Sequence, residues 1–233
     1  MMPDIDLAAL AHTISVWILP VLFAVTFHEA AHGFVANMLG DDTARRLGRV
    51  TFNPLKHVDP FGTVILPALL LLGSGGRFMF GFAKPVPVNF ARLNRPRRDM
   101  VLVAAAGPGA NLILALLSGI ALTSVPELPP AAVEWTAQNL VNSVWINLLL
   151  AVFNMLPVPP LDGGRVAVGL LPDVLARPLA RLERVGILII LGVVFLLPLI
   201  GDQIGVDLNI FWWLVGVPAQ ALMNLLFAGL GLA

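Results

Sequence analysis

His28, Glu29 and His32 form an HExxH motif, the strongest chemical signal in the chain. Residues four apart lie on the same face of a helix, so both imidazoles can bind a single zinc ion. Glu29 lies next to the first of them, where it can act as a general base toward water at the metal. The motif lies within a long apolar stretch, where ionisable side chains are costly unless they are paired or functional. The pattern therefore predicts a metal-dependent hydrolytic site inside a membrane.

A catalytic zinc ion usually takes a third protein ligand, a His or a carboxylate, and leaves its fourth position to water. Asp162 is the best-placed candidate, in the segment 154–164 (NMLPVPPLDGG). Prolines and a glycine pair interrupt the helix there, so the carboxylate can turn inward from irregular backbone. Asp162 could instead be an ordinary turn or N-cap residue. Asp59 is a competitor, but it lies in a basic connector where a solvated turn is the expected role.

The composition is that of a membrane protein. Hydrophobic residues make up 58% of the 233-residue chain and charged residues 12%, against about 45–50% and about 25% in soluble domains. Its 14 basic residues balance 14 acidic ones, so no net field attracts nucleic acid. The chain has no Cys, so any metal must be held by His and carboxylate. These observations exclude a disordered chain and a disulfide scaffold.

Five apolar stretches are long enough, or nearly so, to cross a bilayer, which takes about 20 helical residues. They are 7–39, 100–124, 135–156, 185–200 and 208–233. We therefore expect an all-α, multi-pass protein of the cell membrane, with residues 1–233 forming one domain. All 14 Lys and Arg lie in the connectors 45–56, 77–98 and 165–184. The positive-inside rule places these connectors in the cytoplasm and the N-terminus outside, with the active site toward the cytoplasmic side.

A further apolar run, 61–73, is too short to cross comfortably and has basic residues on both sides. We expect the region 58–90 to be re-entrant or β-like on the cytoplasmic side, which is permitted where protein shelters its backbone. Residues 84–89 (KPVPVN) should be extended, because each Pro disfavours helix in the residue before it. A short sixth span is the alternative. It would invert every later segment and place Asp162 on the membrane side opposite His28.

HEAAH in an early span, GPGAN at 107–111 and NMLPVPPLDGG late in the chain together resemble the site-2 proteases, a family of membrane-embedded zinc metalloproteases. The resemblance implies that His28, His32 and Asp162 bind one zinc ion and that Glu29 is the general base. It also implies that Asn154 contacts the substrate or the active site. No segment suits a PDZ domain, so the chain resembles the compact form without one. The implied activity is regulated intramembrane proteolysis of transmembrane segments of other proteins.

Other interpretations stay open at this point. A metal-binding membrane transporter could use the same His face, although transporters usually spread ionisable groups over several spans. A non-proteolytic membrane chaperone would have no need of Glu29. His57 could be a solvated loop residue, or it could line the cytoplasmic mouth of the site. Gly107 and Gly109 are expected to permit close helix packing, and 84–89 is a candidate edge for holding an unwound substrate by strand addition.

Overall fold

The computed structural model describes residues 6–66, 69, 81 and 84–232, and within these residues it is helical, with no strand. Five helices are long and apolar enough to cross a membrane: Ala8–Met38, Pro96–Thr123, Pro130–Asn154, Gly186–Ile204 and Trp212–Gly229. They correspond to the five stretches predicted from hydrophobicity. The all-α, membrane-spanning prediction is therefore confirmed.

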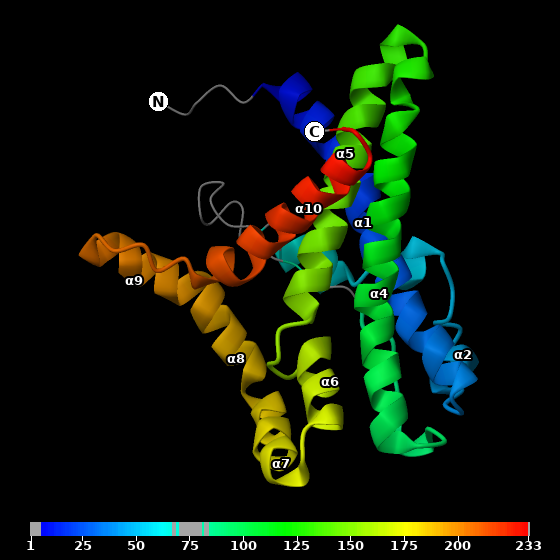
Figure 1. Ribbon diagram of the computed structural model, residues 1–233, viewed down its shortest axis with the longest axis vertical. Helices are drawn as coiled ribbons and strands as arrows, with labels where there is room; N and C mark the ends of the chain where they lie inside the picture. Colours follow the sequence, from blue (N-terminus) through cyan, green and yellow to red (C-terminus); the bar gives the residue numbers. More distant parts are fainter. Residues whose placement is uncertain (1–5, 67–68, 70–80, 82–83, 233) are drawn as a thin grey trace.

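Three long helices form the core of the molecule: α1 (Leu7–Met38), α4 (Pro96–Thr123) and α5 (Pro130–Asn154). They pack side by side, and the short helix α6 (Asp162–Leu170) packs against α4 (Figure 1). The buried face of α4 is made of small or short residues that recur every three or four positions, among them Ala104, Gly107, Asn111, Ala115 and Gly119. Small residues let helix backbones approach closely in a membrane. This close approach is what brings α4 to the motif on α1.

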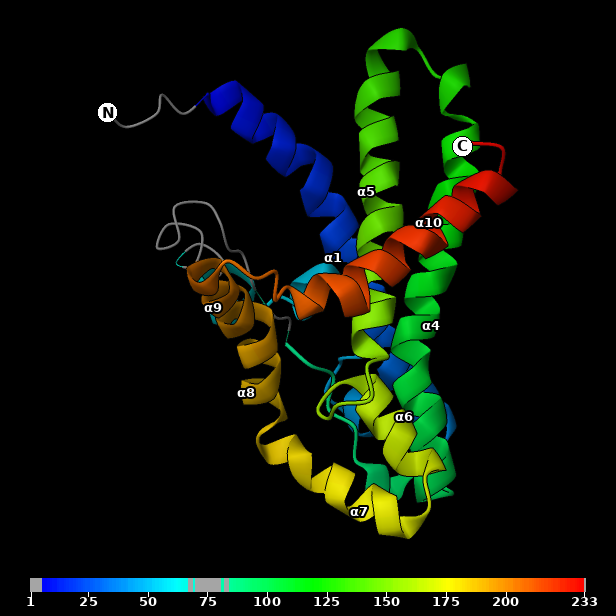
Figure 2. The ribbon, with the colours of Figure 1, turned by 60° about the vertical axis from the view of Figure 1, so that its left-hand side comes forward.

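Further helices follow α6 in the chain. They are α7 (Asp173–Arg181), α8 (Gly186–Leu191), a π-helical turn (Gly192–Leu196), α9 (Leu197–Ile204), a second π-helical turn (Trp212–Gly216) and α10 (Val217–Gly229). Ala219 of α10 packs on Ala115, Val144 and Leu148 of α4 and α5. In contrast, α8 and α9 extend away from the three core helices in both views (Figures 1 and 2).

The connection between α1 and α4 begins and ends at the same end of the bundle. The backbone N–H of Asn94 donates to the Leu39 carbonyl at 2.8 Å, and the backbone N–H of Asn89 donates to Asp41 Oδ2 at 2.6 Å. Short helices lie in between: α2 (Thr43–Arg46), Pro54–Lys56, the π-helical turn Pro60–Ile65 and Phe90–Arg92. Residues 67–68 and 70–73 of the predicted excursion at 61–73 lie outside the described residues. Its flanks nevertheless agree with a connection that makes no net crossing.

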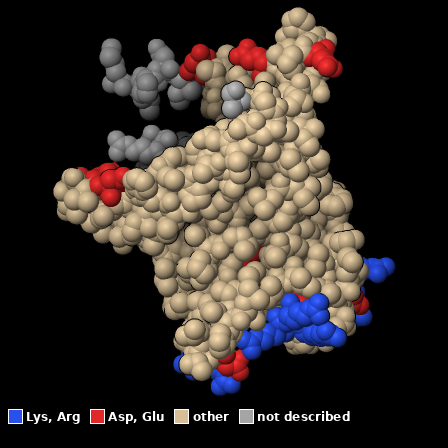
Figure 3. Space-filling model, in the orientation of Figure 1, with Lys and Arg blue, Asp and Glu red and all other residues tan. Residues whose placement is uncertain are grey.

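The charges are segregated along the long axis of the molecule. Figure 3 shows Lys and Arg gathered at the end where Figure 1 places α7 and the first turns of α4. Asp and Glu show at the opposite end and on the tip near α9, and some also show beside the basic residues. The basic connectors predicted from the sequence thus meet at one end of the protein.

Candidate metal centre

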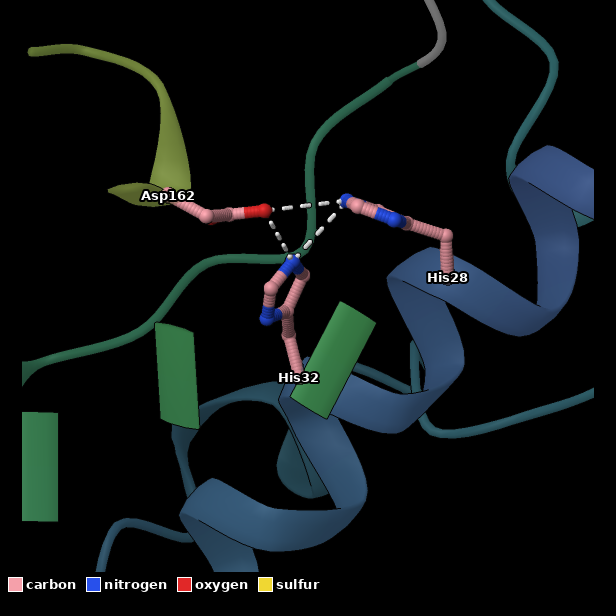
Figure 4. A group of neighbouring side chains, drawn as sticks. All are labelled: His28, His32 and Asp162. Atoms are coloured by element: carbon pink, nitrogen blue, oxygen red, sulfur yellow. Dashed lines mark hydrogen bonds and ion pairs between the residues drawn. The ribbon is translucent and has the colours of Figure 1, made fainter. Parts of the chain in front are cut away.

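The structure brings together the three predicted metal ligands. His28 and His32 lie one turn apart on α1 with 8% and 9% exposure, and Asp162, the first residue of α6, is 6% exposed. The two Nε2 atoms are 3.1 Å apart. Asp162 Oδ2 lies 3.2 Å from His28 Nε2 and 3.3 Å from His32 Nε2 (Figure 4). Two segments more than a hundred residues apart therefore meet at one buried point.

The partners of the two imidazoles decide which ring nitrogen carries the hydrogen. His32 Nδ1 lies 2.7 Å from the Val103 carbonyl oxygen, which can only accept, so this Nδ1 is the donor. His28 Nδ1 lies 2.7 Å from Asn111 Oδ1. The amide of Asn111 is oriented by its Nδ2, which donates to the Ala24 carbonyl at 3.1 Å. Both Nε2 atoms are therefore without hydrogen, and each has a lone pair free to bind a metal ion.

Three electron-pair donors thus converge on one point, and this arrangement fits zinc. Asp162 Oδ2 is buried and has no hydrogen-bond partner among the described residues. A tetrahedral site with zinc–ligand distances of about 2.0–2.1 Å has ligands about 3.3 Å apart, close to the 3.1–3.3 Å found here. Gly107 leaves the necessary room, because a Cβ there would lie 2.4 Å from His32 Nε2 and 2.7 Å from His28 Nε2. The expectation of simple helix packing at Gly107 is thus too general, since this residue faces the ligands.

Glu29 borders the same site. It lines a cavity of about 320 Å³ together with the three ligands, and Asn154 and Arg165 also line that cavity. The Val86 amide donates to Glu29 Oε2 at 2.7 Å, which holds the carboxylate at the cavity wall. Asn154 Nδ2 donates to the Leu150 carbonyl at 3.0 Å. Because Asn154 lines the cavity, its side chain lies at the candidate site.

The segment 84–89 forms one wall of this cavity and is not helical, as its prolines predict. It is fixed at both ends. The Lys84 amide donates to the His57 carbonyl at 2.9 Å, and Arg49 Nη2 donates to the Lys84 carbonyl at 2.5 Å. At the other end, the Asn89 amide donates to Asp41.

His57 and Asp59 lie apart from the metal ligands. His57 is only 2% exposed, and its Nε2 lies 2.9 Å from the Thr51 carbonyl oxygen. The solvated-loop interpretation of His57 is therefore wrong, and His57 is not among the described residues that line the cavity. Its backbone carbonyl instead anchors 84–89. Asp59 accepts a hydrogen bond from the Gly62 amide at 2.7 Å and so caps a turn, the role expected for it.

Asn111 is a site residue that the sequence analysis did not assign. The motif GPGAN was noted as part of a family resemblance, but its Asn was given no role. The available signal was an amide side chain in the middle of an apolar span, since such groups need an internal partner. Asn147, 0% exposed on α5, carries the same signal and hydrogen bonds to Asn111.

Three buried side chains that could hold a metal ion lie beside a carboxylate, and two of the three are on the candidate spanning helix α1; this arrangement fits a membrane metallohydrolase. The sequence profile of peptidase family M50 matches residues 16–139 and 124–199. YwhC of Bacillus subtilis, named as a zinc metalloprotease, is 40% identical over 186 residues, which cover 78% of this chain and 80% of YwhC. No solved structure matches.

Two proteins named Rip2, also described by name as zinc metalloproteases, are further relatives. Rip2 of Mycolicibacterium smegmatis is 34% identical over 170 residues, 72% of this chain and 62% of its own length. Rip2 of Mycobacterium tuberculosis H37Rv is 31% identical over 193 residues, 83% of this chain and 70% of its own length. The chain belongs to peptidase family M50, as the resemblance to site-2 proteases predicted, and it is a metalloprotease.

Proposed function

We propose that this protein is an intramembrane zinc endopeptidase that hydrolyses peptide bonds in transmembrane segments of other membrane proteins, with one zinc ion per chain. The observation that carries the proposal is the convergence of acceptor atoms from His28, His32 and Asp162 beside Glu29 in one cavity. His28, Glu29 and His32 lie on the candidate spanning helix α1, so a soluble substrate would have to reach them through the membrane boundary. The names of the relatives supply the expectation of zinc and of proteolysis.

The residues of the site suit peptide hydrolysis. Zinc held by the triad would supply a Lewis acid that polarises a peptide carbonyl and acidifies water. Glu29 would accept the proton of the attacking water and return it to the leaving amine. The hydrogen bond from the Val86 amide keeps the Glu29 carboxylate at the cavity for this role. Asn154, through its second N–H, would donate to the carbonyl oxygen as it gains negative charge.

The wall at 84–89 supports a substrate that binds as an extended strand. A helix hides its peptide bonds, so a transmembrane substrate must unwind locally before cleavage. Pro85 and Pro87 lack an N–H, and the backbone amides of Lys84 and Asn89 already donate to the His57 carbonyl and to Asp41. The Val86 amide donates to Glu29, and the Val88 amide has no partner among the described residues. Strand addition there would lay the substrate beside the base.

We further propose that the protein lies in the cell membrane with its N-terminus outside and its active site toward the cytoplasm. The basic end of the molecule in Figure 3 supports this orientation by the positive-inside rule. The contact between Leu39 and Asn94 supports it as well, because it returns the chain to the same end before α4 begins.

The test is co-expression of the protein with candidate single-span proteins, comparing wild type with Glu29→Gln. We expect Glu29→Gln to retain zinc and to abolish cleavage, because it removes the base and leaves the ligands intact. Mass spectrometry of the products should place the cut inside the transmembrane segment. His12→Ala is the matched control, since His12 lies near the other end of α1, 2.8 Å from Gln138, and should retain both properties.

Three outcomes would contradict the proposal. Cleavage by Glu29→Gln at a rate near wild type would exclude Glu29 as the base. A cut outside the transmembrane segment would exclude intramembrane hydrolysis. Metal flux that depends on His28, without cleavage of any membrane protein, would favour the transporter.

A further inference from the structure

Two buried asparagines connect the metal site to helix α5. Asn111 of α4 and Asn147 of α5 are both 0% exposed, and a buried amide in a membrane must find its partners within the protein. Asn111 Oδ1 lies 2.7 Å from His28 Nδ1, and Asn111 Nδ2 donates to Asn147 Oδ1 at 2.7 Å. A continuous chain of hydrogen bonds therefore runs from a predicted metal ligand on α1, through α4, to α5, the three helices that lie side by side in Figures 1 and 2.

Backbone carbonyls give this chain its direction. Asn147 Nδ2 donates to the Ser143 carbonyl at 2.8 Å, and a carbonyl can only accept, so Asn147 must turn its Oδ1 toward Asn111. Asn111 Nδ2 donates both to that Oδ1 and to the Ala24 carbonyl at 3.1 Å. Its own Oδ1 is therefore turned toward His28. The orientation of the Asn147 amide thus favours one orientation of the Asn111 amide, in which Oδ1 faces His28.

We infer that Asn147 is a positioning residue for the metal site: by holding the amide of Asn111, it keeps the ring hydrogen of His28 on Nδ1 and leaves Nε2 free to bind metal. The inference rests on the proposed role of His28 as a ligand. Without the acceptor at Asn147, only the Ala24 carbonyl still holds Asn111 Nδ2, so the rotated amide, which offers an N–H to His28 Nδ1, becomes more populated. In that rotated form the ring hydrogen of His28 lies on Nε2, where it prevents metal binding.

Two variants of Asn147 separate this role from simple packing. Asn147→Leu has a similar size and removes the acceptor. Asn147→Asp keeps it, because a carboxyl group buried in apolar surroundings is neutral, so that its O–H donates to the Ser143 carbonyl and its C=O accepts from Asn111. Asn142→Leu is the matched control. Asn142 lies on the same helix and donates to the Val16 carbonyl of α1 at 3.0 Å, without contact to Asn111.

Zinc affinity of the purified full chain, measured by competition with a chelator, is the first readout. We expect Asn147→Leu to bind zinc at least about tenfold more weakly, within the range of about 10–100-fold seen when a partner of a metal ligand is lost. Asn147→Asp and Asn142→Leu should bind zinc like wild type. Nitrogen-15 NMR of the four histidines in zinc-free protein is the second readout. It should report hydrogen on Nδ1 of His28 in wild type and a larger share of hydrogen on Nε2 in Asn147→Leu.

Wild-type zinc affinity in Asn147→Leu, or an equal loss in the Leu and Asp variants, would overturn the inference. If Asn147→Leu does not fold, Asn147→Ala removes the same acceptor and replaces it in the comparison. A wild-type protein that binds no zinc would be a different result, since it would overturn the proposed metal site itself. Zinc binding in wild type with no effect of Asn147→Leu would overturn only the role of Asn147.

Discussion

Gly107 and Gly109 are two residues apart in one motif, yet they face different surroundings. A Cβ at position 107 would lie within 2.4–2.7 Å of the two imidazole rings. A Cβ at position 109 would meet nothing within 4 Å. Both glycines suit a tightly packed membrane helix, so the motif alone does not distinguish them. Only Gly107 occupies the space against the predicted ligands.

Gly107→Ala should therefore lower zinc affinity strongly, whereas Gly109→Ala should not. The new methyl group must displace the imidazole of His32 or His28. We expect zinc affinity to fall at least about tenfold, as it does when other ligand positions are disturbed. Zinc content after dialysis and chelator competition measure the effect. Equal zinc affinity in the two variants would show that the ligands do not lie against α4.

The carboxylates Asp162 and Asp59 form a second matched pair. Asp162 Oδ2 lies within 3.3 Å of both Nε2 atoms, whereas Asp59 caps the turn that contains Gly62. Asp162→Ala should lose most of the bound zinc, and so should His28→Ala, because a site of two ligands binds zinc much more weakly than one of three. Asp59→Ala should retain it. Elemental analysis of the purified variants decides, and full retention in Asp162→Ala would remove this residue from the site.

At the scale of single residues, the sequence predicted what depends on local spacing. His28 and His32 are four apart on one helix, so their common face follows from helix geometry. The partners of their Nδ1 atoms, Val103 and Asn111, come from another helix and depend on how α1 and α4 pack. No spacing within the sequence encodes that contact. The same reason explains why the burial of His57 was not predicted.

Helix α6 carries Asp162 at its first residue and is fastened to α4 at its other end. Arg97 of α4 donates to the Gly169 carbonyl at 3.1 Å, to the Leu171 carbonyl, and to Asp173 Oδ1 at 2.7 Å. One guanidinium thus satisfies carbonyls at the C-terminus of α6 and an acid at the start of α7. The position of Asp162 therefore depends on the hydrogen bonds of Arg97 to the far end of α6 as well as on the turn that precedes Asp162.

Arg97→Ala should make α6 open more often. Loss of two hydrogen bonds and a half-exposed ion pair is worth about 1 kcal/mol, which corresponds to roughly fivefold faster amide exchange over 162–171. Hydrogen–deuterium exchange in nanodiscs measures it. Arg98→Ala is the control, because Arg98 is exposed and has no hydrogen bond or ion pair among the described residues. Identical exchange in the two variants would mean that Arg97 does not hold α6.

Asp41 holds one end of the cavity wall 84–89 in place. It accepts hydrogen bonds from Thr43 and from the Asn89 amide. Burial raises the pKa of Asp41, but the hydrogen bonds outweigh it, so the pKa lies below its ordinary value of 3.8. A lowered folded-state pKa means that the charged form stabilises the fold above about pH 3.8. That stability is lost as the pH falls below this value through the folded-state pKa.

Asp41→Asn should therefore be less stable than wild type near pH 7, by about 1–2 kcal/mol, the difference expected when hydrogen bonds to a charged group become neutral. The difference between the two proteins should shrink as the pH falls below 3.8, because Asp41 of the wild type takes up a proton as the pH approaches its lowered folded-state pKa. Thermal unfolding followed by Trp fluorescence between pH 3 and pH 7 tests this. A difference that stays constant over the whole pH range would exclude the charge of Asp41 as its cause.

At the scale of elements, hydrophobic length predicted the spans and proline predicted the non-helical character of 84–89, because both are local properties of the chain. The position of 84–89 in the fold, in contrast, is not a local property. Arg49, His57 and Asp41 hold the 84–89 segment against α1 through bonds between distant residues. The bend within the fourth span was also not predicted. Its π-helical turn at Gly192–Leu196 lies in a stretch whose hydrophobicity is uniform.

The molecule as a whole has a basic end and an acidic end, and the metal site depends on how often the chain passes between them. The histidines lie in the C-terminal half of α1, and Asp162 follows α5. Helices α4 and α5 cross the membrane in opposite directions, so the chain after α5 is on the side where α4 began. Asp162 can therefore reach the histidines only if the connection from α1 to α4 begins and ends on the same side of the membrane. The hydrogen bond between Asn94 and Leu39, at 2.8 Å, joins the two ends of that connection. Site geometry and charge distribution thus require the same topology.

This topology predicts which positions of the Cys-free chain an impermeant thiol reagent can reach from outside intact cells. Asn94→Cys should resist labelling until the cells are opened, because position 94 lies at the basic end beside the C-terminus of α1. Glu127→Cys should label at once, because it lies in the turn Val125–Glu127 between α4 and α5, at the opposite end. The parent protein, which has no Cys, is the control for background. Strong outside labelling at position 94 would contradict the proposed orientation and, if the C-terminus of α1 lies inside, would mean that 61–73 crosses the membrane. Every later segment would then be inverted, and Asp162 could not share a metal ion with His28.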